Sequence, residues 1–161
     1  MEGHQKFTVN GGLTLITVPM KRVESVTVLV MVRTGSRDEP EKLAGISHFL
    51  EHMVFKGTEK YPTPLSISSA IDAIGGEFNA FTSKEYTGFY VTAAVKHLPV
   101  ALDVLSQMLT KPLLERDALE REKGVVIEEI NMYEDLPPRK ISTVFDRLVF
   151  GNNGLGRETI G

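Results

Sequence analysis

The feature that most restricts the fold of this chain is the run Ser25–Arg33 (SVTVLVMVR), which is β-branched and almost continuously apolar. β-Branched side chains pack well on a pleated surface and are disfavoured in helices. The run therefore predicts a β-strand, and its lack of polar alternation predicts a central strand. A buried strand needs neighbouring strands and a cover, so the chain must build a sheet with other elements packed on it.

Turn residues and side-chain periodicity indicate the other elements. Apolar stretches on both sides of a glycine-rich turn at Asn10–Gly12 predict a β-hairpin, and two further strands are expected at Glu77–Phe81 and Tyr86–Ala94. Apolar residues at helical spacing predict helices at Leu43–Phe55, Leu65–Ile74, Leu98–Leu109, Leu114–Tyr133 and Arg139–Phe150. The order predicts an α+β fold in which helices cover a mainly antiparallel sheet.

Composition excludes several classes of function. The net charge is −3 and the basic residues are scattered, which argues against nucleic-acid and anionic-membrane partners. The longest apolar run, Val26–Val32, is too short for a membrane helix, and Met1–Phe7 lacks the apolar core of a signal peptide. We therefore expect a cytoplasmic protein. The absence of cysteine excludes disulfides and thiolate metal sites.

A histidine pair carries the clearest chemical signal. His48 and His52 are four residues apart, so on a helix they project from the same face and can converge on one metal ion. Glu51 lies beside that face, where a carboxylate can reach a metal-activated water without binding the metal. The pattern H-x-x-E-H is the inverzincin motif of zinc peptidases.

Two histidines at helical spacing are more often surface or core residues than metal ligands, so the motif needs support. The predicted helix carries apolar residues on its other sides, which indicates burial apart from a polar edge; they are Ile46, Phe49, Leu50 and Met53. Polar side chains on a buried helix need partners, and a metal would supply them.

A catalytic zinc site needs a third protein ligand. His4 lies in the N-terminal tail and His97 at the start of a helix, so neither suits the role. The acidic helix Leu114–Tyr133 is the better source, and spacing alone leaves Glu128 and Glu129 as alternatives. Its glutamates are Glu115, Glu120, Glu122, Glu128, Glu129 and Glu134, of which Glu122 and Glu129 share a face two turns apart. The apolar run Val125–Ile127, just before Glu128 and Glu129, predicts that this helix passes through the core.

Longer segments resemble the pitrilysin/insulinase family, which includes the mitochondrial processing peptidases. The resemblance spans nearly the whole chain and rests on Gly35–Pro40 (GSRDEP), Gly45–Thr58 (GISHFLEHMVFKGT), Gly75–Ala80 (GGEFNA) and Val125–Ile130 (VVIEEI). It implies that His48, His52 and Glu129 bind Zn²⁺, that Glu51 is the general base, and that Glu122 orients a ligand histidine. It also implies that Asn79 and Ala80 lie on an edge strand that binds extended peptide. One departure is Gly154, which replaces a proline of the family pattern.

The resemblance predicts a zinc-dependent endopeptidase that hydrolyses extended peptides or small unfolded proteins. Family members have two similar halves, and the second supplies an Arg and a Tyr for substrate and oxyanion binding. The glycine-rich end Gly151–Gly161 indicates that residues 1–161 are an N-terminal zinc-peptidase domain cut before its end. We therefore expect a second half or partner chain, and homo-oligomer formation through the exposed strand near Asn79. The alternatives are a non-catalytic peptide-binding or assembly module, or a fragment inactive without its partner half.

Overall fold

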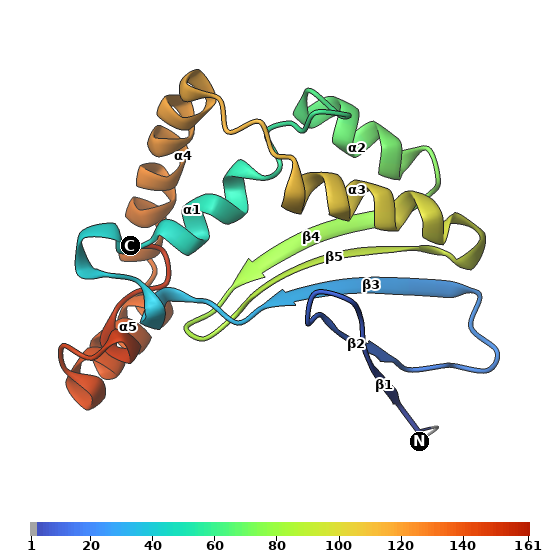
Figure 1. The fold of residues 1–161 in the computed structure, drawn as a ribbon. Coiled ribbons are helices and arrows are strands. Elements are labelled where there is room, and N and C mark those ends of the chain that lie inside the picture. The colour runs from blue at the N-terminus through green and yellow to red at the C-terminus, as the bar shows by residue number, and fades with distance from the viewer. Residues whose placement is uncertain (1–2) are drawn as a thin grey trace.

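A computed structural model describes residues 3–161 and contains a three-stranded antiparallel sheet (Figure 1). Its strands are β3 (Ser25–Val32), β5 (Thr87–Ala94) and β4 (Glu77–Thr82), in that spatial order. Helices α2 (Pro64–Asp72) and α3 (Leu98–Thr110) lie along one face of the sheet. The predicted α+β fold, with helices on an antiparallel sheet, is confirmed.

The remaining elements lie around this sheet. Helices α1 (Ile46–Met53), α4 (Arg116–Glu134) and α5 (Pro137–Phe150) gather towards the end of the sheet where β4 and β5 are joined. The hairpin of β1 (Gln5–Thr8) and β2 (Thr14–Thr17) lies on the side of the sheet opposite α2 and α3. Short 3₁₀ helices occupy Ser36–Asp38, Glu41–Leu43, Val95–His97 and Gly154–Gly156.

The core is the layer between the sheet and helices α2 and α3, which we call the apolar layer. Side chains from all three elements are fully buried there: Ile67, Ile71, Val91, Ala101 and Val104. Helix α2 begins at Pro64, one residue before the predicted start, because Thr63 accepts a hydrogen bond from the Ser66 amide and Pro64 suits the first turn. The helical spacing of Ile67 and Ile71 points both side chains at the sheet.

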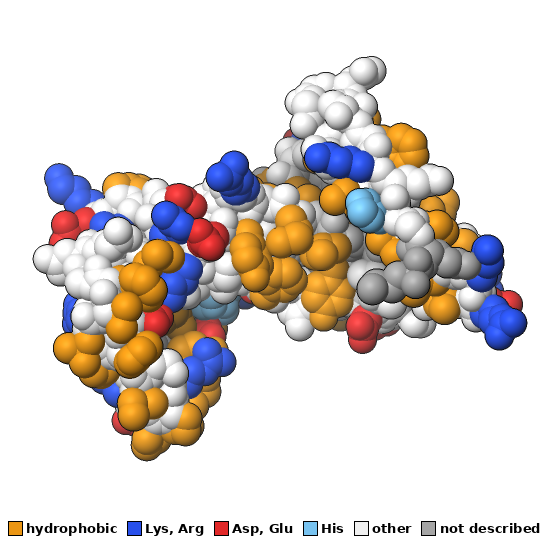
Figure 2. Space-filling view, turned by 90° about the horizontal axis from the view of Figure 1, so that it is seen from below, with side chains coloured by type: hydrophobic (Ala, Val, Ile, Leu, Met, Phe, Trp, Pro, Cys, Tyr) orange, Lys and Arg blue, Asp and Glu red, His pale blue; other side chains and the backbone are white. Residues whose placement is uncertain are grey.

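The prediction that Ser25–Arg33 is a central strand is wrong for the sheet in residues 3–161. β5 is the middle strand, and β3 pairs with it on one side only. Successive side chains of β3 alternate between faces, and only one face is covered by helices. Leu29 and Met31 are therefore about half exposed on the uncovered face, and Figure 2 shows hydrophobic side chains gathered on that side of the molecule.

Among the helix boundaries that differ from the predictions, two starts have clear physical reasons. Helix α1 starts at Ile46 and not at Leu43, because Gly45 has a left-handed φ of 83° that breaks the helix before it. Helix α5 starts at Pro137 and not at Arg139, because proline needs no hydrogen-bond partner for its nitrogen in the first helical turn. No helix within residues 3–161 is long and apolar enough to cross a membrane.

Candidate metal centre

Helix α1 is held at its N-terminus by a buried carboxylate. Glu39 accepts hydrogen bonds of 2.7 Å from the amides of Gly45 and Ser47, which have no partner inside the helix. Negative charge at this end also suits the helix dipole. A side chain at Gly45 would collide with the Ile160 carbonyl at 2.5 Å. The start of α1, and with it the direction of the histidine-bearing face, is therefore set by Glu39 and Gly45.

His48 and His52 project from α1 towards α4, where Glu129 meets them. The ring centroids of the two histidines are 4.6 Å apart. Nε2 of His48 lies 3.8 Å from Glu129 Oε1, and Nε2 of His52 lies 3.5 Å from Glu129 Oε2. Within residues 3–161, these three side chains form the one group of His, Cys, Asp or Glu whose ligand atoms converge, all within 4.8 Å of one another.

The spacing and chemistry of this group fit a zinc ion. The two nitrogen–oxygen distances are too long for good hydrogen bonds. Ligand atoms about 2.0–2.2 Å from a tetrahedral ion lie roughly 3.3–3.6 Å from each other, which is close to the two nitrogen–oxygen separations. Two imidazoles and one carboxylate also form a common ligand set of catalytic zinc, which leaves a fourth position open.

The structure distinguishes Glu128 from Glu129, the two candidates for the third ligand. Glu129 is half-buried beside the histidines, whereas Glu128 is exposed and belongs to no converging group within residues 3–161. The prediction that Val125–Ile127 runs through the core is wrong, because Val126 alone of the three is buried. Helix α4 touches α1 along a single stripe, so its adjacent apolar residues face outwards.

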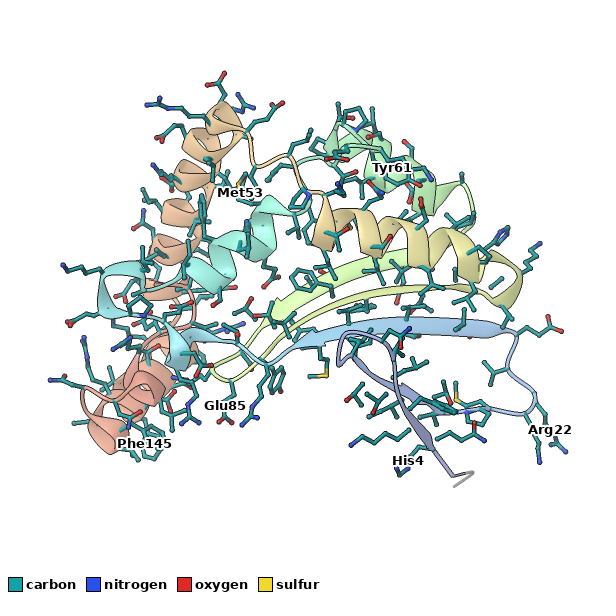
Figure 3. The ribbon with its side chains drawn as sticks, in the orientation of Figure 1. His4, Arg22, Met53, Tyr61, Glu85 and Phe145 are labelled. Carbon is teal, nitrogen blue, oxygen red and sulfur yellow. The ribbon has the colours of Figure 1, made fainter. Side chains whose placement is uncertain are left out.

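Helix α1 is also less buried than its sequence predicts. Met53 is fully buried and lies between α1 and α4 (Figure 3), but Ile46 and Leu50 are 43% and 47% exposed. α1 packs against α4, β4 and the 3₁₀ helix Ser36–Asp38, and these contacts leave Ile46 and Leu50 partly open to solvent. The site thus lies at a helix–helix contact near the surface and not in the core. His4 lies far from it on the N-terminal hairpin (Figure 3).

Glu122 links the second histidine to a lysine. Its Oε1 lies 2.8 Å from His52 Nδ1, and its Oε2 lies 2.6 Å from Lys56 Nζ, while only 6% of its side chain is exposed. Burial acts to raise the pKa of Glu122, but the hydrogen bonds from Lys56 and then His52 outweigh it and hold that pKa below its ordinary value. The ionised carboxylate can only accept from His52 Nδ1, so in the neutral form of the ring Nε2 is the unprotonated nitrogen.

His48 lacks such support. Its Nδ1 is buried and has no hydrogen-bond partner within residues 3–161. Burial lowers the pKa of His48, and the neighbouring His52 lowers it further, against the opposite effect of Glu129. A depressed pKa favours the neutral imidazole, which is the form that binds metal.

Glu51 stands apart from the converging group. Its Oε2 accepts a hydrogen bond from the hydroxyl of Thr82, the last residue of β4. Its negative charge is near enough to act on His48, where it partly opposes the lowering of the pKa by burial and by His52. The carboxylate is therefore beside the converging ligands and is oriented by a strand that packs against α1.

Asn79 and Ala80 lie on β4, which is an edge strand of the sheet within residues 3–161. The Ala80 amide donates to the Asn79 side-chain oxygen at 2.9 Å, and Ala80 lies opposite Phe89 of β5 in the sheet. The other edge of β4, whose end touches Glu51, has no neighbouring strand within residues 3–161. Such an edge offers backbone groups to an added strand.

Two residues of this site were missed by sequence reasoning, although each carried a signal. Lys56 continues the four-residue spacing of His48 and His52, but the predicted helix Leu43–Phe55 ends one residue before it. The spacing was therefore not extended to Lys56. Thr82 lies one residue beyond the predicted strand Glu77–Phe81, yet it follows Phe78 and Ala80 on the helix-facing side of β4 at strand spacing. Both signals become informative once the contact between α1, α4 and β4 is known.

Comparison with known proteins gives a consistent result. The model of the insulinase family (peptidase family M16) matches residues 15–161. An uncharacterized zinc protease of Streptomyces coelicolor is 45% identical over 157 residues, which are 98% of this chain and 34% of that protein. Among solved structures, a protease from Helicobacter pylori has a TM-score of 0.94 at 25% identity over 99% of this chain and 39% of that one. Pitrilysin has a TM-score of 0.84 at 28% identity, covering 99% of this chain and 17% of that one. The chain thus spans about a third of the length of the curated relatives it matches.

Proposed function

The chain belongs to the insulinase family of peptidases, family M16, as its motifs predict, and we propose that it forms the zinc-binding part of a metal-dependent endopeptidase. The protein would hydrolyse extended peptides or small unfolded proteins. The observation that carries the proposal is the convergence of His48 and His52 with Glu129 between two helices. A relative that is 45% identical is named a zinc protease.

In this proposal His48 and His52 of α1 and Glu129 of α4 hold Zn²⁺. A zinc ion bound there would polarise the scissile carbonyl and lower the pKa of water towards about 7. Glu122 accepts a hydrogen bond from the N–H group at Nδ1 of His52 and so keeps Nε2 directed at Glu129. Three protein ligands suit a catalytic site better than a closed structural one.

Glu51 is the proposed general base. It would take a proton on a carboxylate oxygen from the attacking water and pass it to the nitrogen of the leaving amine. The Thr82 hydroxyl occupies Oε2, which limits rotation of the carboxylate and leaves Oε1 as the oxygen that moves the proton. A structural zinc site or a binding module would leave Glu51 without a role.

The peptide would bind along β4. Asn79 and Ala80 belong to this edge strand, and an added strand could pair with the backbone groups along its open edge. A peptide bound as an added strand would run towards Thr82 and thus towards Glu51. Because the chain spans about a third of its curated relatives, we propose that turnover also needs groups from a second half or partner chain, which would bind substrate and stabilise the oxyanion.

The test compares Glu51→Gln with His52→Ala. Elemental analysis and zinc titration should give one zinc per chain for the unchanged protein and for Glu51→Gln, but none for His52→Ala. In the complete enzyme, Glu51→Gln should lower turnover of a quenched fluorescent peptide by about 10²–10⁴-fold, the usual contribution of a general acid–base. Loss of zinc from both variants would contradict the general-base assignment. Unchanged protein that takes up no zinc would contradict the metal site itself.

A further inference from the structure

Lys56 lies beside the proposed metal centre, although it is neither one of the three ligands nor the proposed general base. It follows α1, where its amide donates to the Met53 carbonyl at 3.0 Å. The next residue, Gly57, has a φ of 144°, and a side chain there would approach the Pro62 carbonyl to 2.6 Å. The chain at Lys56 is therefore held in one tight turn and not in a loose loop.

The two oxygens of Glu122 have different partners. One faces His52 Nδ1 at 2.8 Å, and the other faces Lys56 Nζ at 2.6 Å. Because only 6% of the Glu122 side chain is exposed, water has little access to replace either partner. Removing the lysine would leave a buried carboxylate oxygen unpaired, and the carboxylate could then turn away from His52 to find another donor.

We propose that Lys56 is a positioning residue of the metal centre. Lys56 fixes the Glu122 carboxylate so that it accepts a hydrogen bond from His52 Nδ1–H, which leaves His52 Nε2 free to bind metal. The inference rests on the proposed zinc site, since it assigns a role in preparing one of its ligands. Lys56 touches neither metal nor substrate in this scheme. It acts through two contacts in series, from ammonium to carboxylate and from carboxylate to imidazole.

The other ligand histidine shows why this matters. His48 Nδ1 has no partner within residues 3–161, so no contact there selects its tautomer. His52 is thus the histidine whose ring is set before metal arrives, and the contact that sets it depends on Lys56. Outer contacts of this kind typically change metal affinity by about 10–100-fold.

The test replaces Lys56 with Met, which keeps the chain length and removes the ammonium group. K56M should weaken zinc binding by about 10-fold, measured by competition with a chromophoric chelator. In metal-free protein at about pH 8, where imidazole is neutral, long-range ¹H–¹⁵N NMR should show His52 with its proton on Nδ1 in the unchanged chain. In K56M the Nε2–H tautomer should appear. K56R should restore both results, because it returns a cation with several donors.

The matched control is K123M. Lys123 is the residue after Glu122, and its exposed side chain pairs with Glu120 at 2.8 Å. K123M removes the same charge from the residue next to Glu122 on α4 but removes no partner of Glu122, so zinc affinity should change by less than about 2-fold, as expected of an exposed pair. Circular dichroism checks folding, and K56Q replaces K56M if the latter does not fold.

A double-mutant cycle identifies the route of the effect. In an E122Q background, K56M should weaken zinc binding by less than about 2-fold more, because its partner is already changed. An equal loss in both backgrounds would overturn the proposal, as would weaker zinc binding with an unchanged His52 tautomer. If the unchanged chain bound no zinc, the proposed function would fail, while the tautomer of metal-free K56M would still decide the role of Lys56.

Discussion

The apolar layer under α2 and α3 and the polar contact between α1 and α4 hold together in different ways. In the apolar layer, Ile67, Ile71 and Val91 are excluded from water and contribute by contact alone, which has no required direction. In the polar contact, Glu122 is equally buried but depends on two donors at fixed positions. Stability of the fold and geometry of the site should therefore respond to different substitutions.

The largest expected effect belongs to the apolar layer. Ile71→Ala removes a fully buried side chain and should destabilise the chain by about 2–5 kcal/mol, from lost transfer energy and the cavity left behind. Denaturant unfolding of metal-free protein measures the change. Zinc affinity of the molecules that remain folded should be unchanged, because Ile71 touches none of the ligands.

Leu102 supplies the control for this prediction. It is on α3 and 49% exposed, so Leu102→Ala should cost less than about 1 kcal/mol. A loss of zinc affinity in folded Ile71→Ala, at conditions where Leu102→Ala keeps it, would show that the two regions are coupled and not separate.

The two regions also differ in how far the sequence predicts them. The apolar layer follows from local patterns: Ile67 and Ile71 have the spacing of residues on one helical face, and both are fully buried. The prediction that β3 is a central strand was wrong, because its apolar run is compatible both with a central strand and with a strand that has one uncovered face. The number of covered faces depends on which other elements pack there, and no local pattern records that.

The polar contact could be predicted only in part. The spacing of His48 and His52 placed both on one helical face, but spacing left Glu128 and Glu129 as alternatives, and only the family resemblance selected Glu129. The pairing of Glu122 with Lys56 and the contact of Thr82 with Glu51 join residues far apart in sequence. Their side chains are common on solvated surfaces, so their type alone gives no sign of burial.

A second prediction tests whether the buried cap at the start of α1 also supports the fold. Glu39→Gln removes the charge that caps α1 and leaves one amide acceptor for the two donors, Gly45 and Ser47. Because Glu39 is buried, the change should cost about 1–3 kcal/mol in denaturant unfolding. Glu41→Gln, at an exposed position nearby, should have little effect. Equal stability of the two variants would mean that the start of α1 does not depend on its cap.

A third prediction concerns geometry without stability. Thr82→Val keeps the size of the side chain but removes the hydroxyl that donates to Glu51. In the complete enzyme, kcat should fall by about 10-fold while KM and zinc content stay nearly unchanged, because the proposed general base would lose its orientation. Thr82→Ser should recover most of the activity. A rise in KM at constant kcat would instead assign Thr82 to substrate binding.

The smallest effect is expected where a polar contact of similar geometry lies near the surface. Asp103 of α3 accepts hydrogen bonds from Lys60 Nζ at 2.7 Å and from Tyr61 Oη at 2.6 Å, but a third of its side chain is exposed. The hydrogen bond from Lys60, and then that from Tyr61, hold the pKa of Asp103 below its ordinary value, against the opposite effect of burial. Solvent screening should limit the loss in Asp103→Asn to about 0.5 kcal/mol at neutral pH.

The sign of its pH dependence follows from the lowered pKa. The carboxylate stabilises the folded chain fully above the unfolded pKa of about 3.9, and this contribution is lost as the pH falls through the folded pKa. The unfolding free energies of the unchanged chain and Asp103→Asn should therefore differ at neutral pH and converge in acid. Asp72→Asn, at an exposed position on α2, serves as the control for a change of net charge. A loss as large as that of Glu39→Gln would contradict the argument that burial, and not contact geometry, makes the polar contact between α1 and α4 sensitive to substitution.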